Sequence, residues 1–192
     1  MLGRALDKRP VIVAIAGPNG AGKTTFFHSH LRQAGLRFLN ADDIARELDI
    51  SAHEAAELTN ALRHELAGQR ESFAFETVFS DPVRDKLTFL TNAVSTGYNV
   101  ILCSIGISGP ETSEERVAMR VSQGGHDVPP EKLVSRFPRT LANLDAAIQT
   151  LPAVLVFDNE NLAAPFREVA EFQDGKPVLV AQVVPQWLRV LR

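Results

Sequence analysis

The sequence has little that would support a disulfide, a membrane span or a strongly charged surface. Its 192 residues contain one cysteine, Cys103, which excludes an internal disulfide and any metal cage built from cysteines. The longest apolar run opens at Val11 and ends before Gly17, far too short to cross a bilayer. The N-terminus lacks the apolar segment and the cleavage site of a signal peptide, so we expect a cytoplasmic protein.

Charge and composition narrow the class of protein further. The 20 Lys and Arg nearly balance the 23 Asp and Glu, and the net charge of −3 argues against a protein that wraps nucleic acid or coats an anionic membrane. With 45% hydrophobic and 22% charged residues, the composition is that of an ordinary globular protein. No repeat, low-complexity tract or linker divides the chain, so we predict a single domain over residues 1–192.

Short apolar runs alternate with longer helical patterns, an order typical of a parallel sheet with crossover helices. The predicted strands are Val11–Ala16, Arg37–Leu39, Phe73–Val78, Asn99–Ile105 and Ala153–Phe157. The predicted helices are Thr24–Ala34, Ser51–Glu71, Pro82–Ser95, Glu111–Gln123 and Pro130–Thr150. Near the end of the chain, Asp174 and Gly175 separate two apolar runs and predict an antiparallel hairpin over about residues 165–184 that extends the sheet.

The first predicted strand runs directly into a stretch that fits G-x-x-x-x-G-K-[ST]: Gly17, Pro18, Asn19, Gly20, Ala21, Gly22, Lys23 and Thr24. Glycines let successive backbone N–H groups turn toward a phosphate, and the following helix adds its dipole. Lys23 can then reach the β- and γ-phosphates, and the Thr24 hydroxyl is placed to bind Mg²⁺. We therefore predict that residues 17–25, which include Thr25, bind ATP or GTP, and the flanking strand and helix favour this over an unliganded glycine-rich turn.

Acidic residues follow or end three predicted strands, at the edge where ligands bind in doubly wound sheets. Asp42 and Asp43 follow the second strand; Asp42 is either a catalytic base or a helix N-terminal charge, and we interpret Asp43 as the latter. Glu76 lies inside an apolar strand, where an unpartnered carboxylate is costly, so it either binds a ligand or forms a buried ion pair. Asp158 ends the fifth strand, where it would direct magnesium, contact a nucleotide or cap a turn.

Two pairs of arginines lack the carboxylate partners that a solvated helix face usually supplies. Arg116 and Arg120, and again Arg136 and Arg139, have no acid three or four residues away. Either an external anion or distant Asp and Glu residues must then balance their charge. The glycine-rich residues 124–130 lie between the pairs, and we predict a hinged lid over about residues 116–139. Pro138 leaves open a break of the last helix near Phe137.

Seven short stretches together resemble the zeta-toxin-like P-loop kinases: residues 17–24, 40–42, 75–77, 120–121, 124–129, 143–144 and 157–159. The resemblance runs from about Val11 to Asn159, and the Gly-Gly-His-Asp-Val-Pro element around His126 is its most specific part. It implies a P-loop α/β three-layer sandwich whose mostly parallel five-stranded sheet has the order 2-3-1-4-5, followed by a C-terminal extension.

The resemblance also implies an activity and residue roles. Zeta toxins use ATP and Mg²⁺ to phosphorylate the 3′-hydroxyl of the sugar in UDP-N-acetylglucosamine, and an antitoxin protein is a candidate partner. By position, Asp42 would be the base, and Lys23, Arg120 and Arg136 would complete the catalytic set. The implied substrate-binding residues are Glu76, Thr77 and Arg116.

Two other functions compete with a small-molecule kinase. In the first, the chain is a motor-type or ABC-type ATPase, because residues 121–125 faintly resemble an ABC signature and Asp158 with Glu160 faintly resembles a Walker B ending. The serine and glycines are spaced wrongly for that signature, and Glu160 stands one residue late. In the second, the chain is a noncatalytic nucleotide-binding module that acts through a protein partner. Turnover that requires an acceptor distinguishes the kinase from both.

Overall fold

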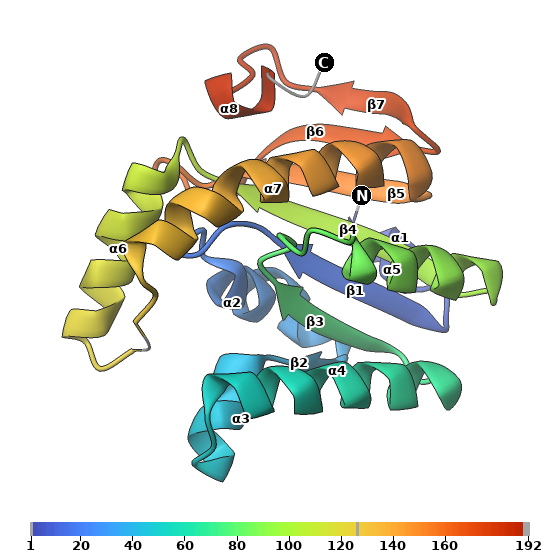
Figure 1. Cartoon of the computed structure of the whole chain (residues 1–192). Helices are drawn as coiled ribbons and strands as arrows, with labels where there is room; N and C mark the ends of the chain where they lie inside the picture. Colours follow the sequence, from blue (N-terminus) through green and yellow to red (C-terminus); the bar gives the residue numbers. More distant parts are fainter. Residues whose placement is uncertain (1, 126, 190–192) are drawn as a thin grey trace.

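The sheet follows the order β2-β3-β1-β4-β5-β6-β7 in the computed structural model, which describes residues 2–125 and 127–189 (Figure 1). Strands β1 to β5 are parallel to one another, and the pairs β5–β6 and β6–β7 are antiparallel. The predicted fold class and the order 2-3-1-4-5 are confirmed, and the C-terminal hairpin adds two strands to the same sheet. The strands span Val11–Ala16, Arg37–Leu39, Phe73–Thr77, Asn99–Gly106, Ala153–Asp158, Arg167–Gln173 and Lys176–Val180.

Helices cover both faces of this sheet (Figure 1). Because the helices bury both faces, central strand β1 is apolar throughout: Ile12 and Ala14 face one core, and Val13 and Ile15 face the other. Within the described part of the chain, no helix is long and apolar enough to cross a membrane. The helices are α1 Leu2–Leu6, α2 Lys23–Phe26, α3 Ala41–Leu48, α4 Ala52–Gly68, α5 Asp85–Ser95, α6 Pro110–Ser122, α7 Pro130–Thr150 and α8 Gln186–Arg189.

Some predicted helix boundaries are wrong. The predicted helix 24–34 is α2 followed by a π turn, Phe27–Leu31, and a 3₁₀ turn, Arg32–Ala34. The apolar spacing cannot distinguish these closely related turns. The pattern also missed α3, which buries none of its residues. Its first turn is fixed by Asn40, whose side chain accepts a hydrogen bond of 2.9 Å from the Asp42 N–H.

Helix α7 passes through Pro138 without the break near Phe137 that the proline had left open. Proline removes one helical hydrogen bond, but packing on both sides of it keeps the two halves in line. Phe137 is buried in one core of the sheet, and Leu144 and Ala147 are buried in the other. Arg136 and Arg139 therefore belong to one continuous helix, as the lid prediction requires.

Candidate functional site

The segment between β1 and α2 has the backbone of a phosphate-binding loop. A Cβ at Gly17 would lie 2.2 Å from the carbonyl oxygen of Ile105, and Gly22 has φ 91°, so both positions require glycine. The loop is fixed from outside by Asn159, whose Nδ2 donates to the Ala21 carbonyl over 2.8 Å. The loop is therefore held in an open turn at the N-terminus of a helix, where anions bind.

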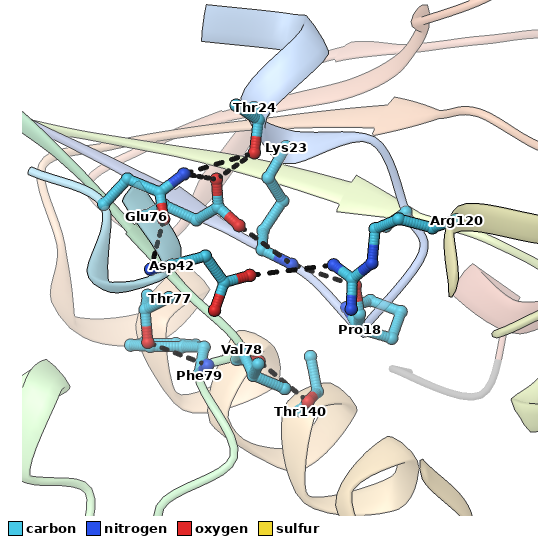
Figure 2. A network of polar contacts seen from close by, with 12 residues as sticks. Pro18, Lys23, Thr24, Asp42, Glu76, Thr77, Val78, Phe79, Arg120 and Thr140 are labelled. Carbon is cyan, nitrogen blue, oxygen red and sulfur yellow. Dashed lines mark hydrogen bonds and ion pairs between the residues drawn. The ribbon is translucent and has the colours of Figure 1, made fainter. Parts of the chain in front are cut away.

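The side chains that begin α2 contact a carboxylate from the neighbouring strand (Figure 2). Lys23 Nζ donates to the Pro18 carbonyl over 3.0 Å and lies 3.7 Å from Glu76 Oε1. Thr24 Oγ1 donates to Glu76 Oε2 over 2.6 Å, and Asn40 Nδ2 donates to the same oxygen over 3.3 Å. Glu76 thus forms the ion pair that we considered, and its partner is the lysine of the phosphate loop.

Burial lowers the pKa of Lys23 below its usual value, while the nearby carboxylates of Glu76 and Asp42 oppose the shift. The Lys23 side chain is 5% exposed, so the attraction between its ammonium and an anion is only weakly screened by solvent. Thr24 Oγ1 and the Glu76 carboxylate are the hard oxygen ligands that Mg²⁺ uses together with substrate phosphates. Both residues therefore fit a magnesium ion at this position.

The structure separates the two neighbouring aspartates at the start of α3. Asp42 lines the cleft, and its Oδ2 lies 3.7 Å from Nη1 of Arg120 (Figure 2). Asp43 is not among the residues that line the cleft, and its Oδ1 accepts a hydrogen bond of 2.6 Å from Arg46. Of the two, Asp42 is thus the acid that a ligand in the cleft can contact, whereas Asp43 forms an ion pair within α3.

A cleft of about 910 Å³ extends from the phosphate loop to α4 and α7. This volume is near the upper end of the range for ligand pockets and leaves space beyond the phosphate loop for a second ligand. Among the residues that the structure describes, eight Lys and Arg line it against four Asp and Glu, although the whole chain is slightly acidic. The charged lining residues are Lys23, Arg63, Lys86, Arg116, Arg120, Lys132, Arg136, Arg139, Asp42, Glu76, Asp81 and Asp127.

All four predicted lid arginines line this cleft. Arg116 donates to the Glu160 carbonyl over 2.9 Å, and Arg139 Nε donates to the Ser135 carbonyl over 3.1 Å. Burial lowers the pKa of Arg136, and the like charge of Arg139 adds to the shift. Arg120 forms an ion pair with Asp42, so its charge is balanced by a distant acid, one of the two alternatives that the sequence had left open. Asp42 itself lines the cleft.

The segment predicted to form a lid packs around a small apolar cluster of its own. Val117 of α6, Val128 of the connecting loop and Leu133 of α7 are buried against one another, apart from the two main cores. His126 of the same loop lies outside the described residues. Thr77, predicted to bind substrate, lines the cleft, and its Oγ1 accepts a hydrogen bond of 3.0 Å from the Phe79 N–H.

Asp158 does not contact the cleft, which corrects its interpretation as a magnesium or nucleotide ligand. Its carboxylate accepts hydrogen bonds from Trp187 Nε1, at 3.0 Å, and from Arg167, at 3.2 Å. Glu160, the other half of the Walker B resemblance, accepts hydrogen bonds from the backbone and hydroxyl of Ser108. Asp158 therefore holds the C-terminal segment, Glu160 holds the segment between β4 and α6, and the ABC-type alternative loses its acidic pair.

Two residues that support or line the cleft, Asn143 and Arg63, were given no role from the sequence. Asn143 donates to the carbonyls of Phe79 and Asp81, each over 3.0 Å, and so fixes the segment after β3. Arg63 of α4 lines the cleft and is 3% exposed. One signal could have found it: like the lid arginines, Arg63 has no acid three or four residues away in its helix.

Comparison with solved structures places the fold among kinases and toxins. A chain of the AvrRxo1-ORF1:AvrRxo1-ORF2 complex with sulphate ions matches with a TM-score of 0.69 and 19% identity, over 93% of this chain and 64% of that one. A chain of the PezAT toxin-antitoxin system of Streptococcus pneumoniae matches with a TM-score of 0.64 and 15% identity, and the match covers 96% of this chain and 85% of that one. A structure described as a putative kinase from Chloroflexus aurantiacus matches with a TM-score of 0.58 and 17% identity, and the match covers 81% of this chain and 91% of that one.

The chain thus spans 64% of the AvrRxo1 complex chain that it matches, and at these identities the likeness concerns the fold. A search of curated protein sequences gave no significant match. The family model described as "Zeta toxin" matches residues 4–169, which include the phosphate loop, Asp42, Glu76 and the lid arginines. The chain belongs to the zeta toxin family.

Proposed function

We propose that this protein transfers the γ-phosphoryl group of ATP to a hydroxyl of a small molecule bound in the same cleft. The observation that carries the proposal is the lining of that cleft. The phosphate-loop cation Lys23, the acid Asp42 and the arginines of α6 and α7 all border one cavity of about 910 Å³. Phosphoryl transfer needs little more from a protein than these groups, because positioning and charge stabilisation supply most of the catalysis.

Each group has a role in the proposed reaction. The acceptor oxygen attacks the γ-phosphorus as the bond to the bridging oxygen breaks, ADP leaves, and the acceptor proton passes to Asp42. Lys23 binds the phosphates, and Arg120 and Arg136 stabilise the negative charge that develops on the transferred group. Glu76 now contacts Lys23, and Asp42 contacts Arg120. Phosphates bound at the loop would compete with both carboxylates for these two cations.

Mg²⁺ would be held by Thr24 and Glu76, the two side chains whose oxygens lie 2.6 Å apart beside the loop. When bound, the ion neutralises charge on the β- and γ-phosphate oxygens. Both residues line the cleft: Glu76 lies in β3, where it is paired with Ile15 of β1, and Thr24 lies in α2, the helix that follows β1 and the phosphate loop. In the proposed reaction Glu76, Thr77 and Arg116, which all line the cleft, also bind the acceptor.

UDP-N-acetylglucosamine is the acceptor we propose, on the strength of family membership and charge. The surplus of positive charge around the cleft suits two phosphorylated ligands, a nucleoside triphosphate and a phosphorylated acceptor. An antitoxin protein is the proposed partner, since the PezAT structure is of a toxin-antitoxin system. Neither proposal invokes nucleic acid or a membrane.

The acceptor is tested by incubating the purified protein with Mg·ATP and separate UDP-sugars, nucleosides and antibiotics, with phosphorylated products identified by mass spectrometry. We expect one UDP-sugar, UDP-N-acetylglucosamine, to gain one phosphate far faster than the others. ATP hydrolysis that proceeds equally well without any acceptor would contradict the kinase and favour an ATPase. Binding of ATP with no turnover would favour the noncatalytic module.

ATP binding has its own expected result. A ligand that binds only the folded state at 100 times its dissociation constant stabilises a protein by about 2.7 kcal/mol. For a chain of this length we expect the melting temperature to rise by roughly 5–10 °C. Lys23→Ala should remove most of that rise, because the buried ammonium is the main cation of the loop. An equal rise in the variant, measured by differential scanning fluorimetry, would mean that the nucleotide binds elsewhere.

A further inference from the structure

Arg63 is buried in the wall of the cleft formed by α4 and the segment after β3. Its guanidinium lies 5.1 Å from the ring centroid of Phe75 and 4.7 Å from that of Phe89, and the residue is 3% exposed. Burial lowers the pKa of Arg63, and the carboxylates of Asp85 and Asp81 oppose that shift. A buried cation destabilises a protein unless its donors are used, so this placement needs a reason.

The hydrogen bonds of Arg63 are incomplete. A guanidinium has five N–H donors, yet among the described residues Arg63 donates one hydrogen bond, from Nη2 to Asn60 Oδ1. Its Nε is buried without a partner, and Asp85, whose side chain is half exposed, lies 3.8 Å from Nη2. Native proteins leave few buried donors unpaired, and each such donor calls for an explanation.

Asp81 supplies an unpaired acceptor on the same wall. Its Oδ1 accepts a hydrogen bond from the Asp85 N–H, whereas its Oδ2 is buried without a partner. Asp81 and Arg63 both line the cleft, and no ion pair within 4 Å joins these two described residues. One unpaired donor and one unpaired acceptor thus belong to residues that line the same cavity, on elements other than the phosphate loop.

We propose that Arg63 and Asp81 are specificity-determining residues that bind two hydroxyls of the acceptor other than the one that is phosphorylated, such as the 4- and 6-hydroxyls of a hexose. Arg63 donates to one hydroxyl oxygen, and the second hydroxyl donates to Asp81. The charges of Arg63 and Lys86 balance those of Asp81 and Asp85, so this wall suits a neutral diol better than an anion. The proposal rests on the proposed function for the identity of the ligand as a phosphoryl acceptor.

Binding of simple probes tests the pair without requiring phosphoryl transfer. Glucose and N-acetylglucosamine serve as neutral diols, and acetate and inorganic phosphate serve as anions, each titrated with a non-hydrolysable ATP analogue present and followed by ligand-observed NMR. We expect both sugars to bind, and Arg63→Met and Asp81→Asn each to weaken that binding at least about tenfold. Arg46→Met, a surface arginine outside the cleft, is the matched control and should change nothing.

Stability separates a binding residue from a structural one. Methionine fills the space between Phe75 and Phe89 without a buried charge, so Arg63→Met should keep the melting temperature or raise it. A lower melting temperature with unchanged sugar binding would make Arg63 structural and overturn the proposal. Should Arg63→Met not fold, Asp81→Asn decides, since its amide oxygen can still accept from the Asp85 N–H.

The remaining outcomes are also decisive. Anion binding that depends on Arg63, or no binding of either sugar to the wild-type protein, overturns the diol site. Sugar binding that Arg63→Met abolishes, in a protein that phosphorylates nothing, would sustain this inference while the proposed function fails. If the protein transfers phosphoryl groups and Arg63→Met has the same kcat and KM as the wild-type protein, the proposed function stands and this inference fails.

Discussion

Asp42→Asn should lower phosphoryl transfer to the acceptor by about 10²–10⁴-fold, because it removes the proton acceptor while keeping the size of the side chain. The amide can still lie beside Arg120, and the exposed ion pair that it replaces stabilises the fold by at most about 1 kcal/mol. The affinity for ATP should change little, since Asp42 is not part of the loop that binds the phosphates. Single-turnover transfer and ATP titration, measured on the same preparation, separate the two effects.

Asp43→Asn is the matched control, one residue away on the same helix turn. Its carboxylate pairs with Arg46 outside the cleft, so we expect no more than about 1 kcal/mol of lost stability and nearly normal transfer. If Asp42→Asn kept wild-type transfer, Asp42 would have no part in the mechanism. If Asp43→Asn were the inactive variant, the base would lie one position further along.

The phosphate loop and the acid beside it could be predicted from the sequence because both depend on short spacings. The glycines of the loop are required by close backbone approaches, as Gly17 shows against Ile105, and such requirements leave a fixed pattern. Asp42 could be placed because it follows a strand, and the carboxyl ends of parallel strands share one edge of the sheet. Which of two adjacent aspartates faces the cleft depends on the rotation of α3, which its Asn40 cap sets.

For Glu76, the sequence indicated correctly that the carboxylate needs a binding partner, but it could not identify that partner. A carboxylate in an apolar strand indicates a partner or a ligand, but the sequence does not say which. The register of β3 beside β1, with Ile15 opposite Glu76, brings the carboxylate to Lys23 and Thr24 at the start of α2. Register between strands more than 50 residues apart comes from the packing of the whole sheet.

Asp158 and Arg63 were misread or missed for the same reason. Asp158 stands at a strand end, where the general rule expects a ligand, yet the C-terminal segment folds back and Trp187 binds its carboxylate. Gly106 permits this contact, because a Cβ there would lie 2.1 Å from the indole ring. The sequence shows that Arg63 lacks an acidic partner in its helix, but it does not show that Phe75 and Phe89, from β3 and α5, pack against the guanidinium. Long-range packing of this kind leaves no short pattern in a single sequence.

Arg120→Ala should lower the rate of phosphoryl transfer by about 10³-fold or more, the range found when an arginine that stabilises the transferring phosphoryl group is removed. The guanidinium is well placed for this role. It lies 3.7 Å from the predicted base Asp42, and its positive charge is close enough to lower the pKa of Lys23 in the phosphate loop (Figure 2). A cation between base and loop acts where negative charge develops, and contributes less to binding of the ground state.

The expected signature is therefore a large fall in kcat with little change in ATP affinity. Arg120→Lys should lie between the wild-type protein and Arg120→Ala, because an ammonium restores the charge but not the planar fork of donors. Arg46→Ala, outside the cleft, should stay within about twofold of the wild-type rate, as expected for an arginine in an exposed pair. A variant that loses activity only in proportion to lost folded protein, measured by its melting curve, would make Arg120 a structural partner of Asp42. In that case Arg136, which is half-buried in the lining of the cleft, is the next candidate for the charge that stabilises the transferred phosphoryl group, and Arg136→Ala is the next variant to measure.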